Sequence, residues 1–439
     1  MGVKPTAAAV GIAGFLAVAS VRADIPLPPW VAEGDVPLAT WARSVGPKPG
    51  HGHRDADSTG PVLASQRLGD LVLYAGPSRG SAKRGVTVAG ATFPIFGARH
   101  GAGCTASWWL VGPLAWTCAD DAVLLPDEPA VPEAIPHPDG LLRDYFFVSH
   151  QGTSAYSDLD TAQEGSPDRE LEGGWGVAVV EQRTVGGERW ARTSKGLWIA
   201  VRDLGAARPS LFHGEHLDGG DAPFDMAWVL PDKASVWPEP SPKSKPKDSR
   251  ARFQLVHVTG ESGPYARVGE ADWMLARDLA RPHLAPPPSE VTRPGEHWID
   301  VELASQTLVA YEGTRPVFAT LVSTGRGPVG TDAATPPGVH RIWVKLLASD
   351  MDNVERDDIN AHFSLEDVPY VQFFDHAVAL HGTYWHRDFG RVKSHGCVNL
   401  APLDARWLFD FTGPRLPSGW AAAYPAAQGI DPGTAVRVR

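Results

Sequence analysis

A spacing of aromatic residues that occurs three times constrains the fold of this chain more than any other feature. Each copy has a tryptophan, an aromatic residue eight positions before it and an aspartate five positions after it. The tryptophans are Trp116, Trp198 and Trp273; the preceding aromatic residues are Trp108, Trp190 and Tyr265; the aspartates are Asp121, Asp203 and Asp278. Because the copies follow one another at intervals of about 75 to 82 residues, we expect two or three small domains of one kind in tandem.

The sequence within each copy favours short β-strands. Residues 177–180 form one of several short β-forming runs that end at glycine, proline or aspartate. The whole chain has 46 glycines and 40 prolines, which disfavours a long helical bundle. Units of this kind are typical of small β-barrels, and they resemble bacterial SH3-like domains. We place them at residues 63–128, 140–212 and 222–283, and a basic insertion at 241–247 interrupts the third.

The N-terminus has the features of a secretory signal peptide. A lysine precedes an apolar run over residues 7–18, and small residues lead up to Ala23. We therefore predict that residues 1–23 direct export to the periplasm or cell envelope and are cleaved after Ala23, with an uncleaved membrane anchor as the alternative. Residues 24–62 are rich in proline and glycine and are predicted to be flexible.

If the protein is exported, the number of its cysteines predicts how they pair. In an oxidising compartment cysteines pair, so three of them leave one thiol over. Cys104 and Cys118 lie 14 positions apart and either form a local disulfide or are two small buried apolar residues. Cys397 is then the odd thiol, and a free thiol in an exported protein needs a chemical reason.

A proline-rich linker at residues 284–295 separates the repeats from a C-terminal domain at 296–420, which leaves 421–439 as a tail. The domain begins with apolar and polar residues in alternation, and turns divide its first part into three strands. This pattern predicts an antiparallel meander, followed by a further strand over residues 339–346.

One helix is expected in the C-terminal domain. Pro402 suits the first turn of a helix, and the apolar stripe that follows it ends before Gly413 and Pro414. The stripe consists of Leu403, Trp407, Leu408 and Phe411. With a single helix among many strands, the predicted fold class of the chain is mainly β.

The chemistry of the chain is concentrated around Cys397. A cysteine becomes a strong nucleophile when a base takes its proton or an imidazolium holds it as thiolate. His395 lies two positions earlier, so on an extended strand it would share a face with Cys397. His381 lies 16 positions earlier and can return on an adjacent strand, whereas His386 reads as a surface residue. Gly396 lets the backbone bend, so that the amides of Gly396 and Cys397 can face an oxyanion.

These residues resemble the signature of a known enzyme family. Ser394-His395-Gly396-Cys397-Val398-Asn399, preceded by His381-Gly382-Thr383, resembles the motif of the YkuD-type L,D-transpeptidases, bacterial envelope enzymes that remodel peptidoglycan. The resemblance spans about residues 296–415, roughly 120 residues, and residues 323–325, 335–338 and 368–370 support it. It implies a β-sandwich-like catalytic domain, which agrees with the predicted meander.

The resemblance also assigns roles to individual residues. Cys397 matches the nucleophile and His381 the general base, while His395 and Gly396 match positions beside the nucleophile where backbone amides would stabilise an oxyanion. The residues expected to shape the site or bind substrate are Tyr370, Gly382, Thr383, Trp385, Ser394 and Asn399. Many family members have arginine where Asn399 stands, which bears on donor preference rather than on catalysis.

The implied reaction is the formation of 3→3 cross-links between peptidoglycan stem peptides through a thioester on Cys397, with no metal or organic cofactor. The formal net charge of −11 gives no broad electrostatic footprint for nucleic acid. Within the family, water or a protein amine could replace the stem amine as acceptor. Outside it, the alternatives are a metallopeptidase with His381, His386, His395 and Cys397 as ligands, and a non-catalytic protein that binds the cell wall through its SH3-like units.

Overall fold

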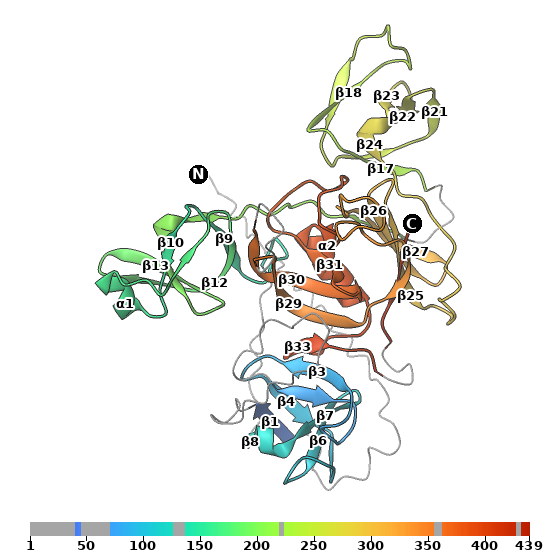
Figure 1. Cartoon of the computed structure of the whole chain (residues 1–439). Coiled ribbons are helices and arrows are strands. Elements are labelled where there is room, and N and C mark those ends of the chain that lie inside the picture. Colours follow the sequence, from blue (N-terminus) through green and yellow to red (C-terminus); the bar gives the residue numbers. More distant parts are fainter. Residues whose placement is uncertain (1–39, 45–70, 126–136, 219–223, 355–361, 427–431) are drawn as a thin grey trace, which may run out of the picture.

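The computed structural model describes residues 40–44, 71–125, 137–218, 224–354, 362–426 and 432–439, with 40–44 as backbone only. Figure 1 shows three small β-rich units, coloured blue, green and yellow, arranged around a larger orange-to-red C-terminal domain. Among the described helices, none has the length and apolar character needed to cross a membrane. The predicted signal peptide lies outside the described residues, so its export role stays a prediction.

The first unit spans residues 71–125. Its strands are β2 (Val72–Tyr74), β3 (Lys83–Thr87), β4 (Thr92–Ile95), β5 (Gly97–Arg99), β6 (Trp108–Gly112), β7 (Ala115–Cys118) and β8 (Ala122–Leu125). They pair in the order β5-β6-β7-β2-β3, and β1 (Thr40–Ser44) pairs with both β4 and β8. The prediction that residues 24–62 are flexible is therefore wrong for 40–44, where strand pairing fixes the backbone.

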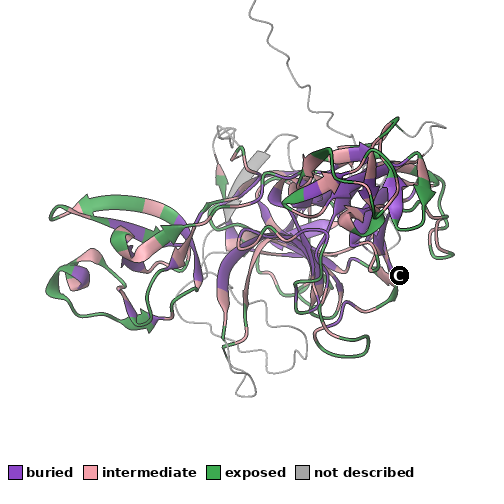
Figure 2. Cartoon of the chain, turned by 90° about the horizontal axis from the view of Figure 1, so that it is seen from above, coloured by how far each residue is buried: buried purple, intermediate pink, exposed green. Residues whose placement is uncertain are grey.

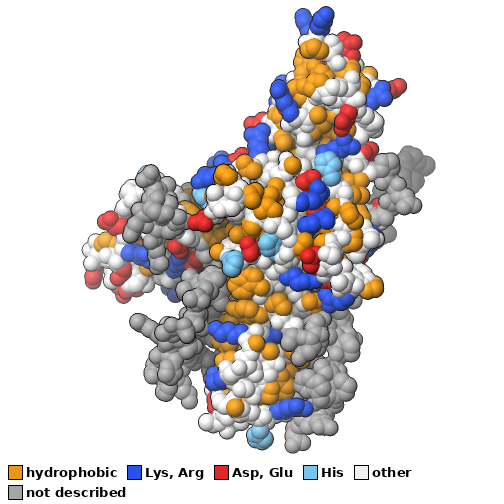
Figure 3. Space-filling model, turned by 45° about the vertical axis from the view of Figure 1, so that its right-hand side comes forward, with side chains coloured by type: hydrophobic (Ala, Val, Ile, Leu, Met, Phe, Trp, Pro, Cys, Tyr) orange, Lys and Arg blue, Asp and Glu red, His pale blue; other side chains and the backbone are white. Residues whose placement is uncertain are grey.

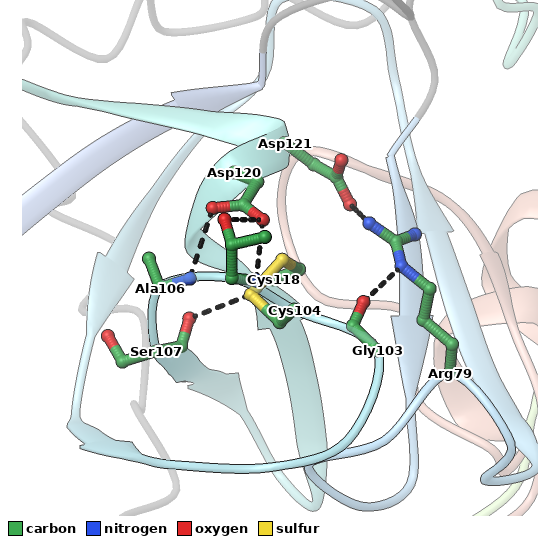
Figure 4. The surroundings of a disulfide bond; sticks show 9 residues. Arg79, Gly103, Cys104, Ala106, Ser107, Cys118, Asp120 and Asp121 are labelled. Atoms are coloured by element: carbon green, nitrogen blue, oxygen red, sulfur yellow. Dashed lines mark hydrogen bonds and ion pairs between the residues drawn. A yellow bond between two sulfur atoms is a disulfide. The ribbon is translucent and has the colours of Figure 1, made fainter. Parts of the chain in front are cut away.

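A disulfide closes the first unit. Cys104 and Cys118 are bonded at an S–S distance of 2.01 Å, which leaves Cys397 as the free cysteine of the three. Figure 4 shows hydrogen bonds around this bridge, including one from the Ala106 amide to Asp120 at 3.3 Å. The sequence alone did not decide whether this disulfide forms, because the distance between the two Cα atoms depends on how β7 folds back beside the loop that carries Cys104.

The second unit spans residues 137–212. Its elements are β9 (Asp144–Val148), β10 (Thr153–Ala155), α1 (Leu159–Glu164), β11 (Arg169–Leu171), β12 (Gly176–Val185), β13 (Glu188–Thr193), β14 (Trp198–Ala200) and β15 (Leu204–Ala206). Five of the strands pair in the order β14-β13-β12-β9-β15. Figure 2 shows this unit as an arm on the left, exposed at its outer end and buried where it meets the rest of the molecule.

The third unit spans residues 224–283. Its strands are β17 (Met226–Val229), β18 (Lys233–Val236), β19 (Asp248–Ala251), β20 (Leu255–His257), β21 (Gly260–Ser262), β22 (Tyr265–Arg267), β23 (Trp273–Leu275) and β24 (Leu279–Ala280). They pair as β20-β17-β24, β18-β19 and β21-β22-β23. The basic insertion lies between β18 and β19, and Lys247 within it forms an ion pair with Asp272 at 2.7 Å.

The sequence repeat is a structural repeat in all three units. The paired strands have one register throughout, with Trp108 opposite Cys118, Trp190 opposite Ala200 and Tyr265 opposite Leu275. A short 3₁₀ helix ends at each repeated aspartate: η2 (Ala119–Asp121), η3 (Val201–Asp203) and η4 (Ala276–Asp278). A second ring meets the preceding aromatic edge-on in each unit, in the pairs Tyr74–Trp108, Tyr156–Trp190 and Trp237–Tyr265. All the repeated aromatic residues except the half-buried Trp273 are buried in the unit interiors, and the likeness to SH3 domains stays a prediction.

The C-terminal domain consists of two sheets and one helix. Its elements are β25 (His297–Glu302), β26 (Thr307–Glu312), β27 (Arg315–Leu321), β28 (Gly338–Arg341), β29 (Val344–Asp352), β30 (Ser364–Asp375), β31 (Val378–Gly382), β32 (Val398–Leu400), α2 (Pro402–Phe411), β33 (Trp420–Ala423) and β34 (Ala435–Val438). One sheet has the order β16-β27-β26-β25-β34-β28, in which β16 (Glu215–His216) precedes the domain in sequence, and the other contains β33-β29-β30-β31-β32. Apolar side chains of both sheets and of α2 share one buried core.

The predicted meander and helix are confirmed, but two boundaries differ. The strand expected over 339–346 is divided at Ile342 and Trp343, where the chain leaves one sheet as β28 and enters the other as β29. The end of the domain at residue 420 is too early, because β34 pairs in parallel with β25 and antiparallel with β28. A four-residue strand after a glycine- and proline-containing segment has too few residues to show a period.

The units attach to the C-terminal domain at different places. β33 pairs with β3 of the first unit, and Gly176 of β12 pairs in parallel with Leu365 of β30. The segment after the second unit adds β16 (Glu215–His216) to the edge of β27. The third unit shares a buried apolar core with the C-terminal domain. On the face drawn in Figure 3, acidic and basic side chains are interspersed over this assembly.

Candidate active site

His381 and Cys397 come from neighbouring parallel strands. Leu380 lies opposite Val398 and His381 opposite Asn399, so Cys397, one residue before β32, lies beside Ala379. Because alternate residues of a strand share a face, the side chains of Cys397 and His381 are diagonal neighbours on one face of the sheet. The structure thus brings together two residues that are 16 positions apart in sequence.

The imidazole of His381 is arranged as a base. Its side chain is buried, and its Nδ1 lies 3.0 Å from the carbonyl oxygen of Gly382. A carbonyl can only accept, so Nδ1 carries the proton and Nε2 has a free lone pair. Burial lowers the pKa of His381 to about 4, which keeps the ring neutral at pH 7. The Trp385 ring stacks on it with centroids 5.6 Å apart.

The thiol of Cys397 is half-buried. Its Sγ lies 3.8 Å from the carbonyl oxygen of Ala377, to which it donates. Burial raises the pKa of the thiol, so a proton acceptor is needed to generate the thiolate. Within the described residues no hydrogen bond joins Cys397 to His381.

The backbone before Cys397 is held by two hydroxyl groups. Thr335 donates to the Gly396 carbonyl at 2.6 Å, and Ser394 donates to the Cys397 carbonyl at 2.5 Å. The Gly396 amide donates to the Ser394 hydroxyl at 3.1 Å. The predicted role of the Gly396 amide in binding an oxyanion is therefore not available in this arrangement, and Ser394 and Thr335 act as supports of the loop.

His395 does not share the face of Cys397. Residues 394–397 bend instead of extending, and Gly396 has a φ of +132°, a conformation that suits glycine. His395 is exposed, its Nε2 contacts the Arg326 guanidinium, and its ring stacks on Phe363 with centroids 5.9 Å apart. Partial burial and the nearby Arg326 lower its pKa. The prediction of a shared face is wrong because it assumed an extended strand.

The C-terminal domain matches a known family model. Residues 296–438 match the YkuD family, described as the L,D-transpeptidase catalytic domain. This part of the chain is a YkuD domain. The match extends past the predicted end at residue 420 and includes β34, which agrees with the strand pairing.

Solved L,D-transpeptidases resemble the chain only at low similarity. The C442S mutant from Enterococcus faecium is 21% identical, with 33% of this chain and 50% of that chain covered and a TM-score of 0.24. The enzyme from Stackebrandtia nassauensis is 27% identical, with 35% and 60% covered and a TM-score of 0.22. L,D-transpeptidase 3 from Mycobacterium tuberculosis is 17% identical, with 42% and 78% covered and a TM-score of 0.26. A search of curated proteins gives no match.

Asn399 connects the YkuD motif to a second histidine. Its side-chain amide lies 2.8 Å from Nε2 of His386, and the Asp388 amide donates to Nδ1 of His386 at 3.1 Å. Because Nδ1 accepts, Nε2 carries the proton, so we assign the Asn399 amide with its oxygen toward Nε2. That assignment also gives a donor to Asn399 Oδ1, a buried atom that otherwise has no partner among the described residues. His386 is half-buried and both of its ring nitrogens have partners, so its interpretation as a surface residue is wrong. Burial lowers its pKa to about 4.

Of the remaining residues predicted to bind substrate, some lie near the base His381 and others do not. Trp385 stands beside the base, and Thr383 is buried with its hydroxyl unpartnered among the described residues. Gly382 serves packing, because a Cβ there would lie 3.0 Å from Pro369. Tyr370 does not face the thiol: its φ is +59°, and its ring packs against Phe409 of α2, whereas Cys397 belongs to a different apolar cluster with Tyr384 and Trp385.

The metal-site alternative has no support in this geometry. Among the described residues the one gathering of possible ligand atoms is Cys104, Cys118 and Asp120, and its two sulfurs are joined in the disulfide. His395 turns outward, while both ring nitrogens of His386 are engaged. The sequence did not predict that Arg326 and Phe363 contact His395, or that His386 and Asp388 lie beside Asn399. These contacts depend on the paths of loops, which have no sequence periodicity.

Proposed function

We propose that this chain is an exported L,D-transpeptidase that joins peptidoglycan stem peptides through an acyl-enzyme on Cys397. The observation that carries the proposal is the position of a free thiol diagonally beside a buried imidazole whose Nδ1 is occupied by Gly382 O. The YkuD match at residues 296–438 supports the same class of enzyme. The acceptor and the 3→3 linkage are parts of the proposal that the experiment below tests.

The first half-reaction forms a thioester. His381 Nε2 takes the proton of Cys397 as the thiolate attacks the carbonyl carbon at the L-centre of the third stem residue. The tetrahedral intermediate collapses, the bond to the terminal D-Ala breaks, and the imidazolium returns its proton to the leaving amine. Since the thiol pKa is raised and the imidazole pKa is lowered, both groups are neutral at rest, and the proton moves as the bond forms.

The second half-reaction transfers the acyl group. The side-chain amine of a neighbouring stem attacks the thioester, His381 accepts a proton from that amine and passes it to the departing sulfur. An amide bond forms, the thioester bond breaks, and Cys397 is regenerated as a thiol. Trp385 covers one face of the imidazole, which limits the access of water to the base.

A defined donor tests the reaction. Incubation of the full chain with a tetrapeptide donor, with and without an amine acceptor, is expected to give a cross-linked product and free D-Ala, as measured by mass spectrometry. Release of tripeptide alone would assign hydrolysis, and no consumption of donor would overturn the proposal. Cys397→Ala is expected to consume no donor.

A covalent inhibitor tests the nucleophile independently. The catalytic domain from Enterococcus faecium is described as acylated by ertapenem. Incubation of this chain with a carbapenem is expected to add one inhibitor mass to the wild type and none to Cys397→Ala. An unchanged wild-type mass, or an equal adduct on Cys397→Ala, would count against the assignment.

A further inference from the structure

The loop that crosses from β31 to the nucleophile, residues 383–396, is here named the crossing loop. It carries Trp385, whose ring stacks on His381 at 5.6 Å, and His386, which contacts Asn399. Trp385 also meets Tyr384 edge-on, with centroids 5.1 Å apart. The crossing loop therefore supplies the ring that packs on the base.

The second unit holds the start of the crossing loop. The Tyr145 ring stacks on the Tyr384 ring with centroids 4.1 Å apart and planes 21° apart, and Tyr384 is 1% exposed. A Cβ atom at Gly176 would lie 2.5 Å from the Tyr384 hydroxyl oxygen, so this ring rests directly on the backbone of β12. The Tyr145 hydroxyl donates to the Asp367 carbonyl at 2.6 Å, which fixes the stack against β30.

The third unit holds the far part of the same loop. Gly390 has a φ of +83°, and a Cβ atom there would lie 2.3 Å from Cδ2 of Leu230. Arg391 donates to the Leu230 carbonyl at 3.5 Å, and Arg252 forms an ion pair with Asp388 at 3.6 Å. The contact is thus close, and it combines van der Waals and charged partners.

The segment between the two units adds further contacts. Arg387 donates to the Arg208 carbonyl at 2.9 Å, and the fully buried Phe389 lies in one apolar core with Phe212 and Trp228. The YkuD domain itself supplies backbone support at the far end, where the Gly390 amide donates to Val322 at 2.8 Å. Trp385 and His386 lie between these two sets of anchors.

We propose that the second and third units support catalysis by positioning a loop of the active site. Tyr145 and Leu230 contact the crossing loop and thereby hold Trp385 on the base His381. The inference deepens the proposed function and rests on it. Tyr145 and Leu230 touch no reacting atom, so they are positioning residues. The first unit has no such role, since among the described residues no hydrogen bond, ion pair or ring contact joins it to the crossing loop.

The test compares Tyr145→Ala and Leu230→Ala with Tyr74→Ala. Tyr74 is the matched control, because its ring packs edge-on inside the first unit, away from the loop. Turnover of the tetrapeptide donor is expected to fall about tenfold or more in the first two variants, mainly in kcat, because small displacements of a catalytic group are costly. Tyr74→Ala is expected to stay within about twofold of wild type, and Tyr145→Phe, which keeps the stack, is expected to recover most of the rate.

A second readout separates positioning from general damage. Cys397 is the free cysteine, so iodoacetamide reports its reactivity against pH without further mutation. Loosening the loop admits water, which relieves the burial that raises the thiol pKa and lowers the imidazole pKa. Tyr145→Ala is therefore expected to shift the alkylation midpoint to lower pH while turnover falls. Thermal unfolding checks that each variant is folded.

Each outcome decides between the two proposals. Wild-type turnover and an unchanged alkylation profile in Tyr145→Ala and Leu230→Ala would overturn the positioning role and leave the proposed function intact. An equal loss in Tyr74→Ala would also overturn it, because that loss would be one of general stability. A shifted alkylation profile in a protein that never consumes donor would sustain the positioning role and remove the proposed function.

Discussion

The first and second units have the same repeated residues but meet the YkuD domain in different ways. Both have the same strand register and the same edge-on pair of rings. The first is closed by a disulfide and joins the domain through β3 and β33, whereas the second places Tyr145 on Tyr384 beside the site. The repeat therefore builds the unit, and residues outside the repeat decide whether a unit serves stability or catalysis.

Removal of the disulfide should give the largest effect, and only on stability. Cys104 and Cys118 close a loop of 14 positions, and loss of such a loop closure costs about 3 kcal/mol of unfolding free energy. Cys104→Ser with Cys118→Ser is expected to unfold the first unit at lower denaturant while donor turnover at 25 °C is unchanged. Urea unfolding followed by limited proteolysis measures the first quantity. A loss of turnover in the folded protein would show that the first unit also reaches the site.

A pair of glycines sharpens the comparison between units. Gly390 and Gly419 have φ values of +83° and +82°, so alanine strains the backbone equally at both. At Gly390 the new Cβ would lie 2.3 Å from Leu230 of the third unit, whereas at Gly419 it would lie 3.4 Å from Ala91 of the first. We expect Gly390→Ala to lower turnover about 100-fold and Gly419→Ala to leave it unchanged. Similar turnover in the two variants would contradict the difference between the units.

Two buried carboxyl groups accept hydrogen bonds from the N-terminal half, and we expect them to make its attachment dependent on pH. Glu366 accepts from the Ala178 amide at 3.2 Å, and Asp404 accepts from the Gly214 amide at 2.9 Å. Burial raises the pKa of each to about 7. Because the folded pKa lies above the unfolded one, their contribution is complete below about pH 4 and is lost as the pH rises through about 7.

The unfolding free energy is therefore expected to fall between pH 4 and pH 8, as Glu366 and Asp404 lose their protons in the folded state. Glu366→Gln, which stays neutral at every pH, should flatten part of this slope. Chemical unfolding at a series of pH values measures it. A slope that is identical in Glu366→Gln and wild type would show that this carboxyl group does not titrate in the window.

The sequence was sufficient for those parts of the fold whose periods are regular. Alternation predicted β25 to β27, and the apolar stripe with Pro402 predicted α2. It was insufficient for β34, a short strand that is stable only because it inserts between β25 and β28. The sequence also did not predict the break between β28 and β29 at Ile342. Both strands have β-forming residues, and the step from one sheet to the other depends on tertiary packing.

The site shows the same limit. The motif identified Cys397 and His381, and a return on an adjacent strand was predictable from the turn-forming residues between them. Side-chain direction was not predictable where the backbone leaves the extended region, as at Tyr370 and Gly396. The link between Tyr145 and Tyr384 spans more than 200 positions and follows no local pattern.

The smallest effect is expected where the second and third copies resemble each other most. Arg202 follows the repeated tryptophan of the second copy and has a counterpart in Arg277 of the third, yet its side chain is 65% exposed and pairs with Glu188 on the surface. Exposed ion pairs contribute at most about 1 kcal/mol, so Arg202→Ala should change the unfolding free energy by less than that and leave turnover unchanged. Urea unfolding and the donor assay measure both. A clear loss of turnover would mean that the repeated surface itself acts in catalysis, whereas the expected result confines that role to the contacts with the crossing loop.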